Sequence, residues 1–295
     1  MRIIAVAFAL LLGSSAIAQT IGLSVSTLDN PFFVTLRDGA QAMANDLGME
    51  LLVTDARDSV STQISDIEDL VQRGIDVLIV NPTDSDAVVP AVAAAMAAGI
   101  PVIAVDRGVN TEGLAYFIAS DNVAGGSAAA EFICGLLDGS GPVVELEGIP
   151  GVSATRERGE GFNTFMREQC PGVEIVARQT ANFNRAEGLT VMENILTAQP
   201  DIAAVFAHND EMALGALQAV EAMGRDIIVV GFDATDDAVA AVEDCRMAAT
   251  VAQLPYQLGA QSVEAAAGIV AAGAPMQTEN IAVELELVTE EACDW

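Results

Sequence analysis

Lysine is absent from this chain of 295 residues, and histidine occurs only once, at position 208. Without lysine there can be neither a Schiff-base lysine nor the lysine of a phosphate-binding loop. A single histidine excludes a metal site built from several histidines, and any Ser-His-Asp triad would have to use it. His208 ends the apolar run IAAVFA, so we interpret it as a strand-end residue beside a helix cap.

Positive charge is also scarce, because 12 basic residues stand against 42 acidic ones and give a net charge of −30. Nucleic-acid binding depends on a basic surface that neutralises phosphates, so a nucleic-acid partner is not expected. The acidity itself fits a salt-tolerant source and compositional drift equally well.

Cysteines are few, at positions 134, 170, 245 and 293, and none forms a CxxC pair. A zinc ribbon or a thioredoxin-type site therefore has no support. In an oxidising compartment an even number of cysteines predicts two disulfides, and the sequence alone allows three pairings.

Long apolar runs are confined to the amino terminus. MRIIAVAFALLLGSSAIA has a basic Arg2, an apolar core over 3–12, and Ala16-Ile17-Ala18 as a cleavage site, which predicts a secretory signal peptide over 1–18. The mature chain would begin at Gln19, and no cysteine follows the cleavage point, so a lipid anchor is not expected. No later run is long enough to cross a bilayer, so we expect a soluble, exported protein.

Short apolar runs alternate with longer, alanine-rich stretches along the rest of the chain. Strands are predicted at 20–26, 50–55, 76–81, 101–106, 114–120, 142–148, 173–179, 202–208, 227–233 and 248–254. Helices are predicted at 31–47, 60–73, 85–98, 122–137, 156–169, 185–198, 210–223, 235–244 and 256–272. The alternation indicates an α/β fold of βαβ units with parallel sheets. Because so many units do not fit one open sheet, we predict two similar lobes with a break near Ser120-Asp121.

Polar and aromatic residues gather where the predicted strands end. The carboxyl ends of parallel strands form the ligand crevice of α/β proteins. The residues there are Asn30, Phe32, Phe33, Asn81, Asp106, Arg107, Ser120, Asp121, Arg156, Arg158, Asn182, Phe183, Asn184, Asn209, Asp210, Phe232, Asp233 and Gln253. Taken singly, several of them also fit as turn or helix-cap residues. Taken together, they favour one ligand crevice shared by both lobes.

The chemistry of this set indicates a neutral polyol. Amides, carboxylates and guanidinium groups offer paired donors and acceptors for vicinal hydroxyls. Two arginines, at 107 and 158, are balanced by two aspartates, at 106 and 233, whereas an anionic ligand would call for surplus positive charge. Phe32 and Phe33 fit either core packing or the C–H face of a sugar ring, and a place in the crevice explains the pair best.

Several long segments carry a resemblance to a known family: VSTLDNPFFVTLRDGAQ, LIVNPTDSDAV, PVIAVDR, IASDNVAGG, ATRERGEGF, FAHNDEMALGAL, VVGFDAT and ATVAQLP. Over essentially all of the mature chain, the sequence resembles the type I periplasmic sugar-binding family of bacterial ABC importers. The resemblance implies a periplasmic protein with two lobes, each a parallel sheet flanked by helices, joined by a three-crossing hinge. The implied lobes are 19–120 plus 254–280 and 121–253 plus 281–295.

The resemblance also implies a function, which is to bind a neutral monosaccharide between the lobes by hinge closure and to deliver it to a membrane permease. D-ribose is the first expectation, and another pentose or a hexose such as allose is the alternative. The protein would be a monomer without cofactor or metal, and a role as a chemosensory sugar receptor is compatible. The implied sugar contacts are Asn30, Phe32, Phe33, Asn81, Asp106, Arg107, Arg158, Phe183, Asn209, Phe232, Asp233 and Gln253.

Some positions depart from the family pattern. His208 stands where the family often has Gln, which bears on fine specificity, and Ala234 stands where it often has Gly. The four cysteines are not a family feature. We expect Cys134–Cys170, because both residues lie near predicted helix ends on one side of a lobe. We expect Cys245–Cys293, because the family's C-terminal strand returns to the helix that Cys245 ends.

Two other kinds of protein fit the sequence less well. A Rossmann dehydrogenase needs G-x-G-x-x-G after its first strand, and here that turn reads STLDNPFF. No set of nucleophile, base and orienting group is visible, so an enzyme, even one acting on sugars, is only a distant alternative. A transcription regulator of the same fold is disfavoured by the signal peptide and by the lack of a helix-turn-helix segment.

Overall fold

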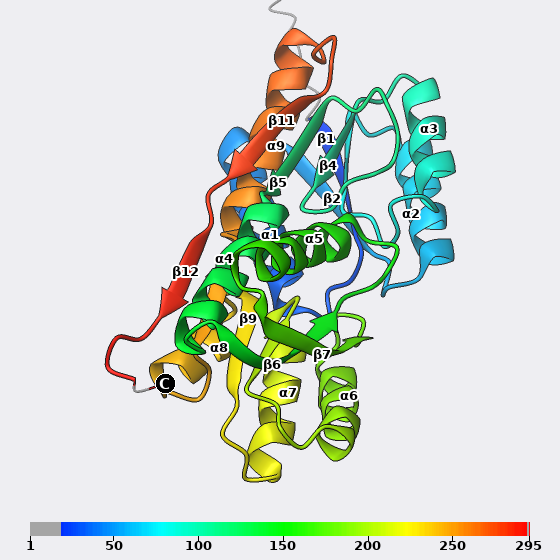
Figure 1. Cartoon of the computed structure of the whole chain (residues 1–295). Helices are drawn as coiled ribbons and strands as arrows, with labels where there is room; N and C mark the ends of the chain where they lie inside the picture. Colours follow the sequence, from blue (N-terminus) through cyan, green and yellow to red (C-terminus); the bar gives the residue numbers. More distant parts are fainter. Residues whose placement is uncertain (1–18, 294) are drawn as a thin grey trace, which may run out of the picture.

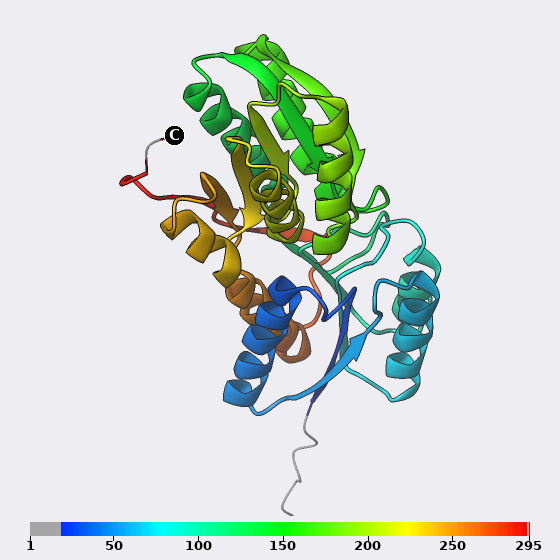
Figure 2. The same cartoon turned by 90° about the horizontal axis from the view of Figure 1, so that it is seen from below.

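The computed structural model describes residues 19–293 and 295, so the predicted signal peptide lies outside the described residues. These residues form two six-stranded sheets with helices packed on them (Figure 1). We call each sheet with its helices a lobe. Figure 2 shows the two lobes, one in blue and cyan and the other in green and yellow, side by side.

The first lobe has the strand order β11-β5-β4-β3-β1-β2, and every neighbouring pair is parallel. Its strands are β1 (Thr20–Val25), β2 (Glu50–Asp55), β3 (Val77–Val80), β4 (Val102–Val105), β5 (Tyr116–Ser120) and β11 (Glu279–Val283). Its helices are α1 (Pro31–Leu47), α2 (Val60–Gln72), α3 (Val89–Ala97) and α9 (Pro255–Ala272).

The second lobe repeats this plan with the order β12-β10-β9-β8-β6-β7, and only β12 is antiparallel to its neighbour. Its strands are β6 (Ser140–Glu147), β7 (Gly172–Thr180), β8 (Ala204–Ala207), β9 (Ile228–Asp233), β10 (Ala249–Ala252) and β12 (Glu286–Thr289). Its helices are α4 (Asn122–Leu136), α5 (Ser153–Gln169), α6 (Arg185–Ala198), α7 (Asp210–Ala222) and α8 (Asp236–Glu243).

The chain passes from one sheet to the other after β5, after β10 and after β11, as the family resemblance implied. The two lobes and the predicted α/β class are therefore confirmed. The strands β11 and β12 were not among those predicted from apolar runs, because most of their residues are exposed or half-buried and give no long apolar run. Only the family resemblance implied a C-terminal strand. The predicted helix 85–98 begins only at Val89, because the Asp84 carboxylate accepts the backbone N–H groups of Asp86 and Ala87 and holds a turn there.

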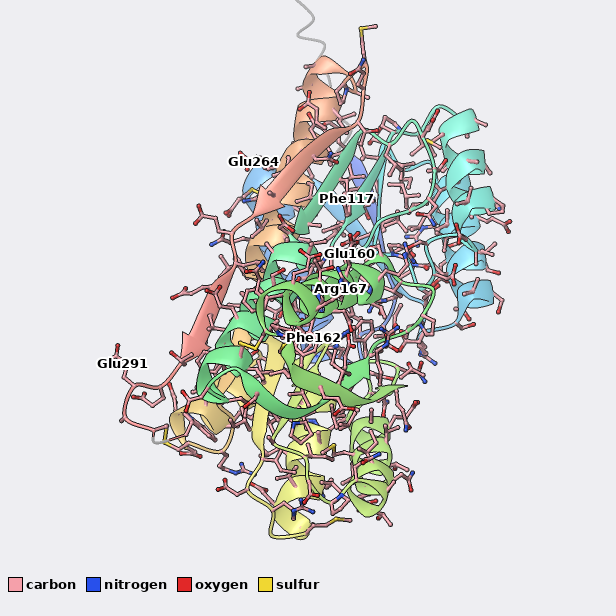
Figure 3. All side chains as sticks on the ribbon, viewed as in Figure 1. Phe117, Glu160, Phe162, Arg167, Glu264 and Glu291 are labelled. Carbon is pink, nitrogen blue, oxygen red and sulfur yellow. A yellow bond between two sulfur atoms is a disulfide. The ribbon has the colours of Figure 1, made fainter. Side chains whose placement is uncertain are left out.

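Small residues let the helices of the second lobe pack closely enough to place the site. A methyl group on Gly126 of α4 would overlap the carbonyl of Arg158 on α5, and one on Gly161 would overlap the carbonyl of Val123. Phe162 of α5, labelled in Figure 3, is fully buried. Its ring stacks on that of Phe206 of β8 with centroids 4.6 Å apart. The helix that carries Arg158 is thus anchored on both sides.

Two disulfides join the cysteines of the second lobe. Cys134 in the last turn of α4 is bonded to Cys170 at the end of α5, with Cα atoms 6.2 Å apart. Cys245, after α8, is bonded to Cys293, with Cα atoms 5.5 Å apart. This is the pairing that the family resemblance and the predicted helix ends favoured. Among the helices of residues 19–293, none is long and apolar enough to cross a membrane.

Candidate functional site

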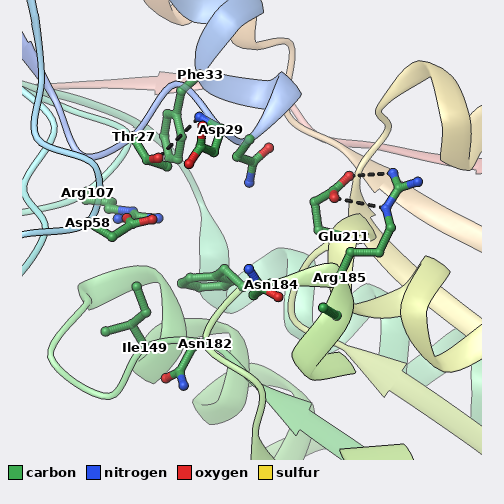
Figure 4. Close-up of a pocket in the computed structure, with 13 residues that line it drawn as sticks. Thr27, Asp29, Phe33, Asp58, Arg107, Ile149, Asn182, Asn184, Arg185 and Glu211 are labelled. Carbon is green, nitrogen blue, oxygen red and sulfur yellow. Dashed lines mark hydrogen bonds and ion pairs between the residues drawn. The ribbon is translucent and has the colours of Figure 1, made fainter. Parts of the chain in front are cut away.

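Residues at the ends of strands from both lobes line one small cavity. All of the sugar contacts implied by the resemblance line it except Asn81 and Phe232. Outside this cavity a wider cleft of about 280 Å³ opens between the lobes, and Asn30, Phe33, Arg107 and Phe183 line both spaces. In Figure 4, Phe33 and Arg107 face Asn182 and Asn184 across this cleft, beside the Arg185–Glu211 ion pair.

The two phenylalanines after Pro31 form the aromatic wall on the first lobe. Phe32 and Phe33 occupy the first turn of α1, are 3% exposed, and pack edge to face with centroids 5.2 Å apart. They belong to the core of the first lobe and also line the cavity, so core packing and a place at the cavity do not exclude each other. The Arg107 guanidinium lies 4.8 Å from the Phe33 centroid and 5.3 Å from that of Phe183, and so bridges the lobes.

Arg158 is the corresponding cation of the second lobe. Its Nε donates to Asn122 Oδ1 at 2.8 Å, and its Nη1 donates to the carbonyl of His208. The guanidinium stacks on the Phe232 ring at 3.9 Å and lies 3.6 Å from Asp233 Oδ1. Phe232 therefore supports Arg158 from behind instead of lining the cavity.

Asn81 also lies one layer behind the cavity. Its Oδ1 accepts from Ser26 Oγ at 2.7 Å, and its Nδ2 donates to Val105 O at 3.1 Å and to Asp106 Oδ2 at 3.0 Å. These contacts use its carboxamide inside the first lobe. Asn81 thus orients the Asp106 carboxylate, which does line the cavity.

Two other asparagines have a double role. Asn30 caps α1 by accepting the N–H of Phe32, and Asn209 caps α7 by accepting the N–H of Met212. Both caps use the side-chain oxygen and leave the amide NH₂ for other partners. Both asparagines are therefore helix caps that also line the cavity.

The cavity holds buried charges at a cost in solvation. Loss of water raises the pKa of Asp106 and raises that of Asp233 well above the ordinary value. Loss of water also lowers the pKa of Arg107 and of Arg158. The ion pairs Arg107–Asp106, at 3.7 Å, and Arg158–Asp233, at 3.6 Å, oppose these shifts. Each lobe thus contributes one cation and one carboxylate, and the set is neutral.

Two acceptors at this cavity have no hydrogen-bond partner among the described residues. They are Asp106 Oδ1 and Gln253 Oε1, and both are buried. Gln253 Nε2 donates to Asp233 Oδ1 at 2.6 Å, so its oxygen is turned away from that carboxylate. A buried acceptor without a donor costs about 1–3 kcal/mol. A ligand bearing hydroxyl groups would remove this cost.

The backbone around the cavity is strained at three of its lining residues. Asp106, Phe183 and Asp233 have φ angles of 64°, 59° and 124°, a region that favours glycine. Each such residue costs about 1–3 kcal/mol, and clusters of them are typical of binding sites. Here the strained conformations aim side chains from both lobes at one space.

His208 takes part only indirectly. Its imidazole is fully buried, and Nε2 lies 2.9 Å from Glu145 Oε1 in the interior of the second lobe. It does not line the cavity and reaches the site through its carbonyl, which accepts from Arg158. The structure agrees with the prediction that His208 stands at the end of a strand, because β8 ends at the residue before it.

Some residues of the site escaped the sequence reading. Ala154 lines the cavity, Asn122 holds Arg158, and Ser153 Oγ accepts the N–H of Gly108 across the lobes at 2.9 Å. Ala154 and Asn122 lie within segments that carried the family resemblance, and Ser153 directly precedes one of them. That position in the chain was the signal that could have found them. Within residues 19–293 and 295, no group of metal-binding side chains forms.

Gly148, which follows β6, gives a first testable prediction. A methyl group there would overlap the Phe183 ring, so Gly148→Ala is expected to push this ring out of the cavity. Phe183 would lose its contact with Arg107, and sugar affinity should fall by about threefold to tenfold, as for the loss of one aromatic or cation–π contact. Calorimetric titration with Gly135→Ala as the control measures this, because a methyl group at 135 meets no atom within 4 Å. Equal affinities in both variants would show that Phe183 tolerates displacement.

The family follows from comparison with known proteins. A family model described as a periplasmic binding protein domain matches residues 21–274. The chain belongs to this family. It is 49% identical to the ribose import binding protein RbsB of Bacillus subtilis over 267 residues, 90% of this chain and 87% of that protein. It is also 49% identical to the RbsB of Escherichia coli, over 89% of this chain and 88% of that protein.

Solved structures agree with this assignment. The myo-inositol binding protein of Caulobacter, bound to myo-inositol, superposes with a TM-score of 0.87 at 34% identity, covering 92% of this chain and 93% of that one. An ABC transporter solute-binding protein of Actinobacillus succinogenes with bound D-allose gives 0.86 at 33% identity, covering 92% and 98%. These relatives are solute-binding proteins and not enzymes.

Proposed function

We propose that this protein is the periplasmic receptor of an ABC importer and binds D-ribose between its lobes. The observation that carries the proposal is the small, charge-balanced cavity, which has unpaired acceptors and is lined from both lobes. Neutral hydroxyl groups fit such a cavity better than a net charge. The 49% identity to ribose import binding proteins supports ribose as the ligand.

Each lining residue except Ala154 then has a role. The groups that would accept from sugar hydroxyls are those of Asp106, Asp233 and Gln253. The groups that would donate to them are those of Asn30, Arg107, Arg158 and Asn209. The aromatic walls beside the sugar ring would be Phe32, Phe33 and Phe183. Asn81 and Phe232 hold Asp106 and Arg158 in place. Ribose hydroxyls would satisfy the buried acceptors that have no donor in the described residues.

The mechanism that we propose is closure of the two lobes about the strand crossings. The lobes would comprise 19–120 plus 254–280 and 121–253 plus 281–295, which is supported by the sheet to which each strand belongs. A ligand shifts an open–closed equilibrium only through its different affinity for the two states. Contacts from the second lobe to a sugar already held by the first exist only after closure, so they drive it.

Export and delivery complete the proposal. The segment 1–18 would be removed as a signal peptide, and the monomeric mature chain would carry the sugar to the membrane permease. Presentation of the sugar to a chemosensory receptor is compatible with the same closed form. Family membership supports the location.

Calorimetric titration of the mature protein tests the ligand. We expect one ribose site per chain, and bound ribose at a hundred times its Kd should raise apparent stability by about 2.7 kcal/mol. D-allose and myo-inositol form the comparison panel, because solved relatives hold them. Tighter binding of either one would replace ribose as the ligand, and binding of no sugar at all would overturn the proposal.

A further inference from the structure

Asp210, which follows the cavity residue Asn209, has a carboxylate that joins three separate segments of the second lobe. It is the first residue of α7, and its side chain is fully buried. Its Oδ2 accepts from the N–H of Thr235 at 2.7 Å and from Thr235 Oγ1 at 3.2 Å. Its Oδ1 accepts from Thr250 Oγ1 on β10 at 2.6 Å.

The direction of these hydrogen bonds is fixed by the groups involved. Thr250 Oγ1 accepts the N–H of Ala234 at 3.1 Å, and a backbone N–H can only donate. The Thr250 hydroxyl is therefore free to direct its own hydrogen to Asp210. Both carboxylate oxygens act as acceptors, which is the arrangement that suits an ionised carboxylate.

Each of the three joined segments carries a cavity residue beside the contact. Asn209 immediately precedes Asp210, Asp233 lies just before Ala234 and Thr235, and Gln253 follows Thr250 by three residues. The carboxylate of Asp210 is thus a common anchor for one donor and two acceptors of the proposed sugar site. It does not itself line the cavity.

The anchor also holds the strained turn after β9. Asp233 and Ala234 have φ angles of 124° and 52°. The N–H of Ala234 donates to Thr250 Oγ1, and the N–H of Thr235 donates to Asp210 Oδ2. A methyl group on Gly231 would overlap Asp210 Oδ1, so glycine in this strand leaves room for the carboxylate. Losing the anchor would let this turn relax and redirect the Asp233 side chain.

We infer that Asp210, acting with Thr250, is a positioning residue for sugar binding: it fixes Asn209, Asp233 and Gln253 in their binding geometry without contacting the sugar. The inference rests on the proposed function. Burial raises the pKa of Asp210 to about 7. Glu211 contributes to this rise, and the hydrogen bonds from Thr250 and Thr235 oppose it. The charge of Asp210 in turn raises the pKa of Asp233 and that of Arg158.

The test measures D-ribose affinity calorimetrically at a temperature at which every variant is folded. Thr250→Val keeps the shape of the side chain but removes the hydroxyl, and Asp210→Asn replaces an acceptor by a donor facing the N–H of Thr235. Each should weaken ribose binding by about tenfold, because a tenfold change in affinity corresponds to the free energy of about one hydrogen bond that holds the binding residues in place. Thr250→Ser retains the hydroxyl and should bind within about twofold of wild type.

Asp236→Asn is the matched control, because Asp236 is an exposed acid one residue beyond the anchored turn. It should leave ribose affinity unchanged. If Thr250→Val lowers the melting temperature but binds ribose like Thr250→Ser, the anchor is only structural and the inference is wrong. That comparison still decides the matter if Asp210→Asn does not fold. If wild type binds no ribose, the proposed function fails and this inference fails with it.

Discussion

Replacing Arg158 by alanine is expected to lower ribose affinity by about tenfold to a hundredfold and to reduce ligand-induced compaction. Charge-assisted hydrogen bonds contribute about 1.5–3 kcal/mol, and about 1.4 kcal/mol corresponds to a factor of ten. Arg158 belongs to the second lobe, so its contact with a sugar held by the first lobe would form only on closure. Titration gives the affinity, and small-angle scattering with and without ribose gives the compaction.

Arg167 offers the control on the same helix, because its side chain is 64% exposed and pairs with Glu168 (Figure 3). Arg167→Ala should bind and close like wild type. If Arg158→Ala also binds like wild type, Arg158 has no part in recognition. If wild type does not compact with ribose, closure of the lobes is the wrong mechanism.

The same substitution should also destabilise the unliganded protein. It leaves Asp233 buried with its cation gone, and breaking a buried pair from one side typically costs about 3–5 kcal/mol. The pKa of Asp233 is already raised by burial, so this carboxyl can take up a proton and reduce the cost. Arg158→Ala/Asp233→Asn should therefore regain stability without regaining ribose affinity. That outcome would separate the structural pair from the binding contact.

The strand and helix pattern was predictable because it depends on local sequence. Apolar runs bounded by turns place the buried strands, and the residues that follow them fall at the sheet edge whatever the details of packing. The edge strands β11 and β12 escaped because exposed strands carry no such run.

The order of layers within the site was not predictable. Asn81 and Asp106 both follow strands of the first lobe, and only the fold shows that one orients the other. The same holds for Phe232, which lies beneath Arg158. The Asp210–Thr250 anchor joins positions 40 residues apart, and no spacing in the sequence indicates it. Side-chain contacts between distant segments depend on register and backbone dihedral angles, which local patterns do not specify.

The disulfide between α4 and α5 should dominate the stability of the second lobe. Cys134 and Cys170 are 36 residues apart, and chain entropy alone predicts a loss of about 4 kcal/mol when the bridge is removed. Cys170 is also buried in the lobe's core, so Cys134→Ala/Cys170→Ala should lower the free energy of unfolding by at least this amount. Neither cysteine lines the cavity, so ribose affinity at low temperature should stay unchanged.

The second disulfide provides the comparison, because loop length alone does not distinguish the two. Cys245 and Cys293 are 48 residues apart, and the chain-entropy estimate is again about 4 kcal/mol. However, this bridge ties down β12, a four-residue edge strand that has no fully buried residue and pairs only with β10 among the described strands. Without the bridge that segment can detach while the rest of the lobe stays folded, which limits the loss of unfolding free energy to the cost of local unfolding.

Cys245→Ala/Cys293→Ala should therefore lose clearly less free energy of unfolding in urea than Cys134→Ala/Cys170→Ala. Hydrogen exchange should show new opening confined to the C-terminal segment. Equal losses from both double variants would mean that β12 unfolds together with the whole lobe.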